Sequence, residues 1–163
     1  MILPVKIPKT NAARLLDKAG VSYALVSYQV DEKDLSATHL AAQLGVNPAC
    51  LFKTLVLHGD KNGHFVCLLP ADAELDLKKA ARHSGNKSCS LIAMKDLQAT
   101  SGYVRGACSP FGMKKSFPCF VHLSLMQWDS VYVSAGVRGL QLVLAPAALL
   151  RVAQAVCADI VLS

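Results

Sequence analysis

The chain has 163 residues, of which 53% are hydrophobic and 17% charged, so it can bury a core and is not a disordered polypeptide. Its N-terminal apolar run is too short for a signal peptide, and no apolar stretch approaches the roughly 18 residues of a membrane-spanning helix. The formal net charge of +6 favours a polyanionic partner. We therefore expect a soluble, cytoplasmic protein that is not bound to a membrane.

The first half of the chain predicts helices and strands in mixed order. Apolar residues at helical spacing follow Thr10 and end at Gly20, and a second such run lies between Ser36 and Gly45. Branched, aromatic and apolar residues are concentrated in three segments that predict strands, over residues 22–30, 52–58 and 64–69. The turn-forming residues 59–63 between the last two predict a hairpin.

In the second half, Asp76 is a suitable cap for a helix over residues 77–83. Short strands are expected around residues 88–92, 119–123, 131–133 and 140–144. Pro146 predicts the start of a final helix whose apolar face extends to Val156. Because helices and strands do not alternate strictly, we expect an α+β fold over one domain, residues 1–163. Its central sheet should be mixed, largely antiparallel and partly barrel-like, with flanking helices.

Several common kinds of site lack sequence support. The chain contains no glycine-rich nucleotide-binding motif, serine-hydrolase elbow or zinc-protease motif. Its six cysteines form no Cys-x-x-Cys pair and no zinc-like cluster with histidine, so we expect them to be reduced and mostly buried. No metal or other cofactor is predicted.

Lys53 stands out because it lies within the apolar segment 51–57. A charged residue in a strand that is buried on at least one face requires an explanation. One interpretation is that its amine reaches water along an apolar stem. The other is that Lys53 is a cation at the mouth of a pocket, where it holds a phosphate or polarises a carbonyl.

Two glycine-containing segments are further candidates. Residues 100–115 combine three glycines, a proline and two lysines, and such a loop is either purely structural or offers main-chain amides to a ligand. Cys108 lies in this loop, but no histidine near it in sequence could activate it, so a packing role is favoured over a nucleophilic one. Residues 133–139 form either an ordinary turn or a ligand contact through Ser134 and Arg138.

The order and spacing of these segments resemble the YbaK/EbsC family of Cys-tRNA(Pro) deacylases, within the editing domains associated with prolyl-tRNA synthetase. The resemblance extends from about residue 9 to 160. Its matching pieces are residues 52–55, 75–79, 101–106, 109–112, 132–136 and 138–140.

This resemblance implies hydrolysis of the ester between an amino acid and the terminal adenosine of tRNA, with Lys53 as the central catalytic residue. It implies that the glycine-rich loop, the Ser-x-Gly segment and a tyrosine line the substrate pocket. The expected substrate-binding residues are Tyr28, Gly106, Ala107, Cys108, Ser109, Pro110, Gly112, Ser134, Gly136 and Arg138. It also implies that the thiol of a cysteinyl substrate attacks its own ester carbonyl.

The sequence departs from the family pattern at two places. Gln141 stands where the family often has an aspartate, and Ser36 and Ala37 stand where it tends to have an aromatic residue. Both departures bear on which aminoacyl group fits. The expected substrate is Cys-tRNA(Pro), with Cys-tRNA(Cys) as a second one, and prolyl-tRNA synthetase is a candidate partner. A deacylase for alanyl- or seryl-tRNA and a non-catalytic tRNA-binding module are the alternatives.

Overall fold

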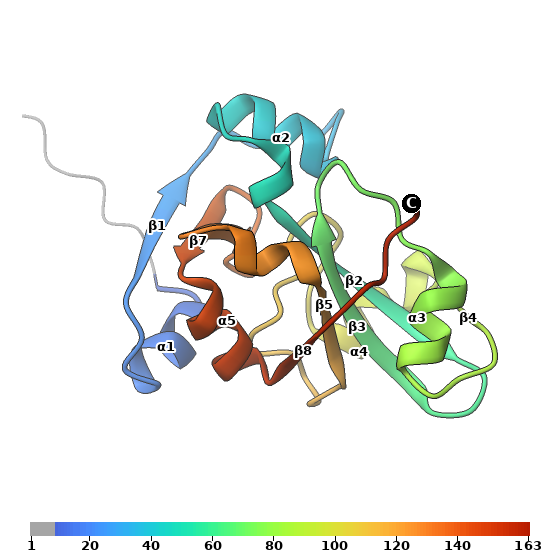
Figure 1. Cartoon of the computed structure of the whole chain (residues 1–163). Coiled ribbons are helices and arrows are strands. Elements are labelled where there is room, and N and C mark those ends of the chain that lie inside the picture. The colour runs from blue at the N-terminus through green and yellow to red at the C-terminus, as the bar shows by residue number, and fades with distance from the viewer. Residues whose placement is uncertain (1–8) are drawn as a thin grey trace, which may run out of the picture.

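A computed structural model describes residues 9–163 of the chain (Figure 1). The α-helices are α1 (Asn11–Lys18), α2 (Ala37–Leu44), α3 (Leu77–His83), α4 (Leu97–Ser101) and α5 (Pro146–Ala153), with 3-10 turns η1 (Pro48–Cys50), η2 (Met94–Asp96) and η3 (Leu123–Gln127). The strands are β1 (Tyr23–Ser27), β2 (Phe52–Gly59), β3 (Gly63–Pro70), β4 (Cys89–Leu91), β5 (Cys119–His122), β6 (Val131–Ser134), β7 (Leu140–Leu144) and β8 (Ala155–Ala158). Within this range no helix is long and apolar enough to cross a bilayer.

Three of the helices begin at the capping residues that the sequence predicts. The side chains of Thr10, Ser36 and Asp76 each accept a hydrogen bond from a main-chain N–H in the first turn of α1, α2 and α3. Such bonds satisfy amide groups that have no partner inside the helix. Helix α2 ends at Gly45, whose φ of 67° is left-handed and therefore suits glycine.

The strands form two sheets. One has the order β4-β2-β3-β5-β8, with β2 and β3 joined as an antiparallel hairpin and β5 and β8 added in parallel. The other is antiparallel, in the order β1-β7-β6. A bridge between Leu51 and Tyr132 joins the start of β2 to β6. The predicted α+β fold with mixed strands is confirmed, although the sheets of residues 9–163 do not close into a barrel.

Strand β3 is buried on both faces, which explains its continuous apolar sequence. Leu68 packs in a core with Phe52 and Val133, between the two sheets and under α1 and α5. The next residue, Leu69, packs in a second core with Leu57 and Ala80 of α3. Because successive side chains of a strand point to opposite faces, one strand contributes to both cores. Strand β3 therefore supports its hairpin partner β2 from a fully packed position.

The predicted extension of the last helix to Val156 is wrong. Helix α5 ends at Ala153, because Gln154 takes a left-handed conformation with φ of 50°. The chain then continues as β8, which pairs in parallel with β5. Val156 therefore lies on an edge strand, where its side chain is 58% exposed.

Candidate active site

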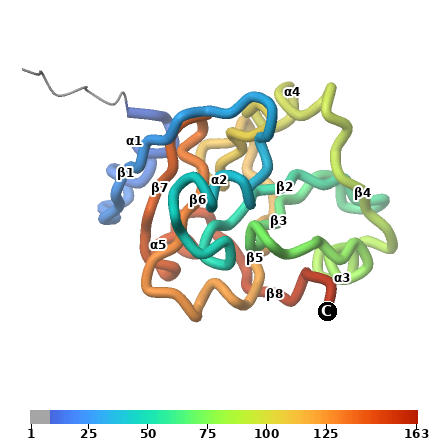
Figure 2. The backbone as a smooth tube through the Cα atoms, turned by 90° about the horizontal axis from the view of Figure 1, so that it is seen from above, coloured from blue at the N-terminus to red at the C-terminus, as the bar shows by residue number. Residues whose placement is uncertain are grey.

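A cleft of about 520 Å³ lies between the start of α2, strand β2 and the turn after α4. Its floor comes from residues 51–56 and one wall from Leu35, Ser36, Ala37 and Leu40. The remaining wall comes from Leu91, Ile92, Met94, Leu97, Arg105, Gly106 and Cys108. Ser134 of β6 and Gln141 of β7 complete it. The tube view shows that the segment between β1 and α2 runs beside the chain that follows α4 (Figure 2). Segments far apart in sequence therefore meet at one opening.

Four of the expected site residues line this cleft, namely Lys53, Gly106, Cys108 and Ser134. Lys53 lies in β2 opposite Leu69, and its Nζ donates hydrogen bonds to the carbonyl oxygens of Ala71 at 3.2 Å and Ala73 at 2.8 Å. An ammonium group has three N–H donors, so one remains for a ligand. Lys53 is half-buried, so both interpretations of its position hold in part. Its aliphatic stem is buried, as the first interpretation requires, and it lines a cleft, as the second requires.

Burial lowers the pKa of Lys53, and the carboxylates of Asp72 and Glu74 oppose that shift by a smaller amount. Removing an ammonium ion from water disfavours its charged form, whereas nearby negative charges favour it. The result is a cation that is poorly hydrated and already oriented by two carbonyl groups. Such a group interacts strongly with negative charge that develops next to it.

Ser134 connects the two sides of the site. Its Oγ donates to the carbonyl oxygen of Ala107 at 3.0 Å and accepts from the N–H of Gly136 at 3.1 Å. The hydroxyl therefore ties the β6–β7 hairpin to the glycine-rich loop. Ala107 itself is buried and does not line the cleft.

Gly112 and Gly136 lie against Tyr103 and do not line the cleft. A Cβ atom at Gly136 would lie 2.9 Å from Cε1 of Tyr103, and one at Gly112 would lie 3.0 Å from its Oη. The Tyr103 hydroxyl donates to the carbonyl oxygen of Phe111. These two glycines therefore make room for a half-buried ring that braces the loop from behind.

The rest of the loop turns away from the cleft. Pro110 and Gly112 line a different, smaller pocket of about 280 Å³, together with residues of α1, β3 and the end of α5. Ser109 is fully buried, and its hydroxyl accepts a hydrogen bond from the N–H of Phe111. Within the glycine-rich loop, Gly106 and Cys108 therefore line the cleft, whereas the residues after Cys108 do not.

Tyr28 and Arg138 are not among the residues that line the cleft. Tyr28 follows β1, and its main-chain N–H donates to the carbonyl oxygen of Gly139. Arg138 is exposed, and its Nε donates to the carbonyl oxygen of Arg105 at 2.8 Å.

The thiol of Cys108 is not disposed to act as a nucleophile at neutral pH. Burial raises its pKa to about 11, so the thiolate is scarce. Its Sγ lies 3.8 Å from the carbonyl oxygen of Val104. A packing role agrees with both observations.

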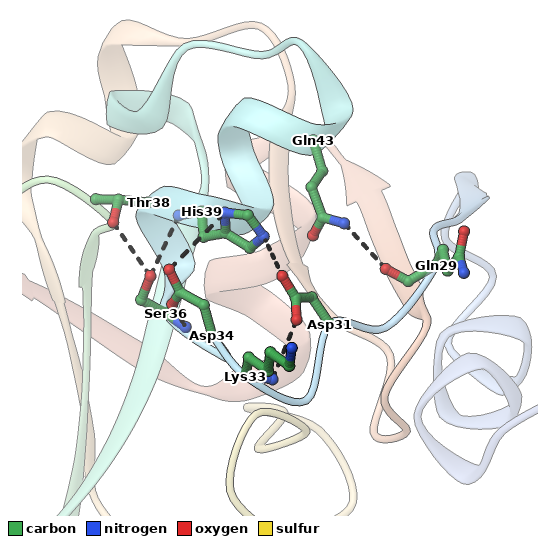
Figure 3. Close-up of polar contacts among 8 residues, drawn as sticks. All are labelled: Gln29, Asp31, Lys33, Asp34, Ser36, Thr38, His39 and Gln43. Carbon is green, nitrogen blue, oxygen red and sulfur yellow. Dashed lines mark hydrogen bonds and ion pairs between the residues drawn. The ribbon is translucent and has the colours of Figure 1, made fainter.

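The segment of residues 29–36, which leads into the wall at residues 35–40, is held by a polar network with α2 (Figure 3). His39 lies between two carboxylates, with its Nε2 3.0 Å from Asp31 and its Nδ1 3.8 Å from Asp34. The Gln43 side chain donates to the carbonyl oxygen of Gln29 at 3.1 Å. These contacts anchor the segment that brings Leu35 and Ser36 to the cleft.

Arg105 and Gln141 also line the cleft, although neither was among the expected site residues. Arg105 directly precedes Gly106, and that adjacency to a loop glycine is the signal that could have identified it. Gln141 was noted only as a departure from a family pattern. It is 3% exposed, and its Oε1 is buried without a hydrogen-bond partner among residues 9–163, as is the Oγ1 of Thr54. Unpaired buried polar atoms beside a cleft are available to a ligand.

Replacing Gln141 with methionine is expected to raise the free energy of unfolding by about 1 kcal/mol. The substitution keeps the volume and removes a buried oxygen that has lost its hydrogen bonds to water. Urea unfolding followed by circular dichroism measures the difference, and Gln98→Met on the exposed side of α4 is the matched control. A lower free energy of unfolding would mean that the Gln141 amide is well hydrogen bonded in solution.

Residues 32–152 match the aminoacyl-tRNA editing domain family. The chain is 45% identical over 152 residues to a protein of Enterococcus faecalis named as a candidate Cys-tRNA(Pro)/Cys-tRNA(Cys) deacylase, EbsC, with 93% of each chain covered. It is 26% identical over 142 residues to the multifunctional Ser/Thr-tRNA deacylase ProXp-y of Escherichia coli, with 86% of this chain and 84% of that protein covered.

Solved structures share the fold. A candidate trans-editing enzyme for prolyl-tRNA synthetase superposes with a TM-score of 0.81 at 23% identity, covering 94% of this chain and 99% of that one. The hypothetical protein APE2540 superposes with a TM-score of 0.85 at 22% identity, covering 94% of this chain and all of that one. The family match covers well over half of the chain and agrees with the resemblance seen in the sequence. The chain belongs to the aminoacyl-tRNA editing domain family.

Proposed function

We propose that this protein is a trans-editing aminoacyl-tRNA deacylase that hydrolyses the ester of Cys-tRNA(Pro), and also that of Cys-tRNA(Cys). The observation that carries the proposal is the poorly hydrated ammonium group of Lys53 at the floor of a cleft large enough for an aminoacyl-adenosine. Family membership supports the reaction class, and the 45% identity to EbsC supports the cysteinyl substrate.

An aminoacyl ester is already reactive, so the protein needs only to position it and to stabilise negative charge. The free N–H of Lys53 is suited to the carbonyl oxygen of the ester as that oxygen becomes negative. The walls at residues 35–40 and at Gly106 and Cys108 would hold the terminal adenosine and exclude water from the cation. Gly106, Cys108 and Ser134 are the proposed substrate contacts.

With a cysteinyl ester, the nucleophile is the thiolate of the substrate itself. Its sulfur forms a bond to the carbonyl carbon, the bond between that carbon and the ribose oxygen breaks, and the oxygen leaves with a proton taken from water. Water then hydrolyses the resulting thioester to free cysteine. No protein nucleophile is needed, which agrees with the raised pKa of Cys108.

A second candidate substrate is a seryl or threonyl ester. The 26% identity to ProXp-y favours it, and so does the buried, unpaired Oε1 of Gln141, which could accept a hydrogen bond from a substrate hydroxyl. A hydroxyl is a far weaker nucleophile than a thiol near neutral pH, so this reaction would require a positioned water.

The tRNA partner is proposed to be tRNA(Pro), selected with the help of prolyl-tRNA synthetase in the cytoplasm. The net charge of +6 is suited to a polyanion, although charge alone does not select one tRNA. Copurification with the synthetase tests this part separately.

The deciding experiment compares deacylation of tRNA(Pro) charged with Cys, Ala, Ser or Pro, with and without added prolyl-tRNA synthetase. Preferential loss of Cys is the expected result. Cleavage of Ser or Ala instead would keep the reaction and change the substrate. If no ester is cleaved under either condition, a non-catalytic tRNA-binding module becomes the better account.

A further inference from the structure

Two arginines from different loops meet at the edge of the cleft. Arg105 lies in the turn of residues 104–107, which is closed by a 3.0 Å hydrogen bond from the N–H of Ala107 to the carbonyl oxygen of Val104. Arg138 lies in the loop between β6 and β7. Its Nε donates to the carbonyl oxygen of Arg105 at 2.8 Å, so its guanidinium group is fixed against that turn.

Neither arginine has an acidic partner within the described range. Both are exposed, and no carboxylate of residues 9–163 lies within ion-pair distance of either one. A cation without an anionic partner is available to pair with a bound anion. Arg138 uses only its Nε in the contact with Arg105, so both of its terminal amino groups remain free to donate.

The main chain between the arginines is also open. Gly106 has a φ of 82°, and a Cβ atom there would lie 3.5 Å from the Nε of Arg138 and 3.6 Å from the Cβ of Leu35. A side chain at this position would occupy the space between the Arg138 guanidinium group and Leu35 in the wall of the cleft. Glycine leaves that space free for a ligand to approach the backbone.

We propose that Arg105 and Arg138 form a binding site for a phosphodiester, namely the phosphate on the 5′ side of the terminal adenosine of tRNA. This assignment rests on the proposed deacylase function. If the aminoacyl-adenosine occupies the cleft, the phosphate attached to its ribose must leave at the edge, and Arg105 is the cationic residue that lines this edge. Guanidinium groups match a phosphate well, because their planar N–H donors bind two oxygens at once.

A purely structural role makes a different prediction. If Arg138 only connects two loops, its loss would disturb the cleft for every substrate, with or without a phosphate. If the pair binds a phosphate, loss of the Arg105 side chain would affect only substrates that carry one. The Arg105→Ala variant is the cleaner test, because the hydrogen bond from Arg138 goes to the main chain of residue 105 and survives the substitution.

The experiment measures hydrolysis of two cysteinyl esters, Cys-tRNA(Pro) and 2′(3′)-O-cysteinyl-adenosine, which lacks the phosphate. For Arg105→Ala we expect the KM for Cys-tRNA(Pro) to rise about tenfold and the slope of log KM against log salt to fall by about 0.7. Hydrolysis of the nucleoside ester should change by less than about threefold, because that ester offers no phosphate to Arg105. Arg105→Lys should recover part of the affinity through charge alone. Arg82→Ala on α3, outside the cleft, removes the same charge and is the control.

An unchanged KM and salt slope for Cys-tRNA(Pro) in Arg105→Ala would overturn the phosphate site while leaving the deacylase function in place. An equal loss for both substrates would also overturn it, in favour of a structural role. If the wild-type protein cleaves neither ester, the proposed function fails, and the phosphate site fails with it.

Discussion

Replacing Lys53 with alanine is expected to lower the single-turnover rate of Cys-tRNA(Pro) hydrolysis by about 100-fold or more. Its ammonium group is held by the carbonyl oxygens of Ala71 and Ala73 and keeps one N–H for the substrate. Removing one donor to a developing oxyanion in a site of low polarity typically costs about two to three orders of magnitude. The rate constant at saturating enzyme measures this effect separately from binding.

Lys53→Met is the matched control for packing. Methionine keeps much of the aliphatic stem and loses the ammonium group with its charge and its two hydrogen bonds to main-chain carbonyls, so it should be as inactive as Lys53→Ala while the fold is retained. Burial already lowers the pKa of Lys53, which means that the charge costs some folding free energy, and its removal should leave the unfolding midpoint little changed. Activity of either variant within tenfold of wild type would remove Lys53 from the mechanism.

The helices and the hairpin could be predicted from the sequence because their signals are local. A capping side chain such as Ser36 acts within its own first turn, and the hairpin of β2 and β3 is closed by neighbouring residues. Strand β8 could not be predicted in this way. Its pairing with β5 joins residues more than thirty positions apart, and the apolar run around Val156 fits a helix equally well until Gln154 reverses the chain.

The site was predictable only in part, for a related reason. Lys53 breaks an apolar pattern, so it can be identified in isolation. The division of the glycine-rich loop cannot, because it depends on Tyr103 packing against Gly112 and Gly136 from outside the motif. Arg105 gains its position from the contact with Arg138, a residue 33 positions away. Motif residues thus identify the loop, while its tertiary contacts decide which of them face the cleft.

The pH dependence of the reaction identifies the nucleophile, and it is expected to follow the thiol of the substrate. With a reference pKa of about 8.5, the thiolate fraction of a cysteinyl ester rises roughly 16-fold between about pH 7 and 8.5. The single-turnover rate, corrected for uncatalysed hydrolysis, should rise with it. At higher pH the rate should fall as Lys53 loses its proton. Because burial lowers the pKa of Lys53, this fall should begin at a lower pH than for an ordinary lysine.

Cys108→Ala distinguishes the two thiols. The pKa of Cys108 is raised to about 11, so a reaction through its thiolate would still be rising at pH 9, whereas one through the substrate thiol would already level off. We expect this variant to keep the wild-type profile and a rate within about threefold of wild type, since only packing in the cleft wall changes. If Cys108→Ala were inactive, the nucleophile would be the Cys108 thiol of the protein and not the thiol of the substrate.

An alanyl ester is the control substrate, because it has no side-chain nucleophile. Its hydrolysis should be slow at every pH and should lack the rise between about pH 7 and 8.5. That difference would assign the rise to the sulfur of the substrate.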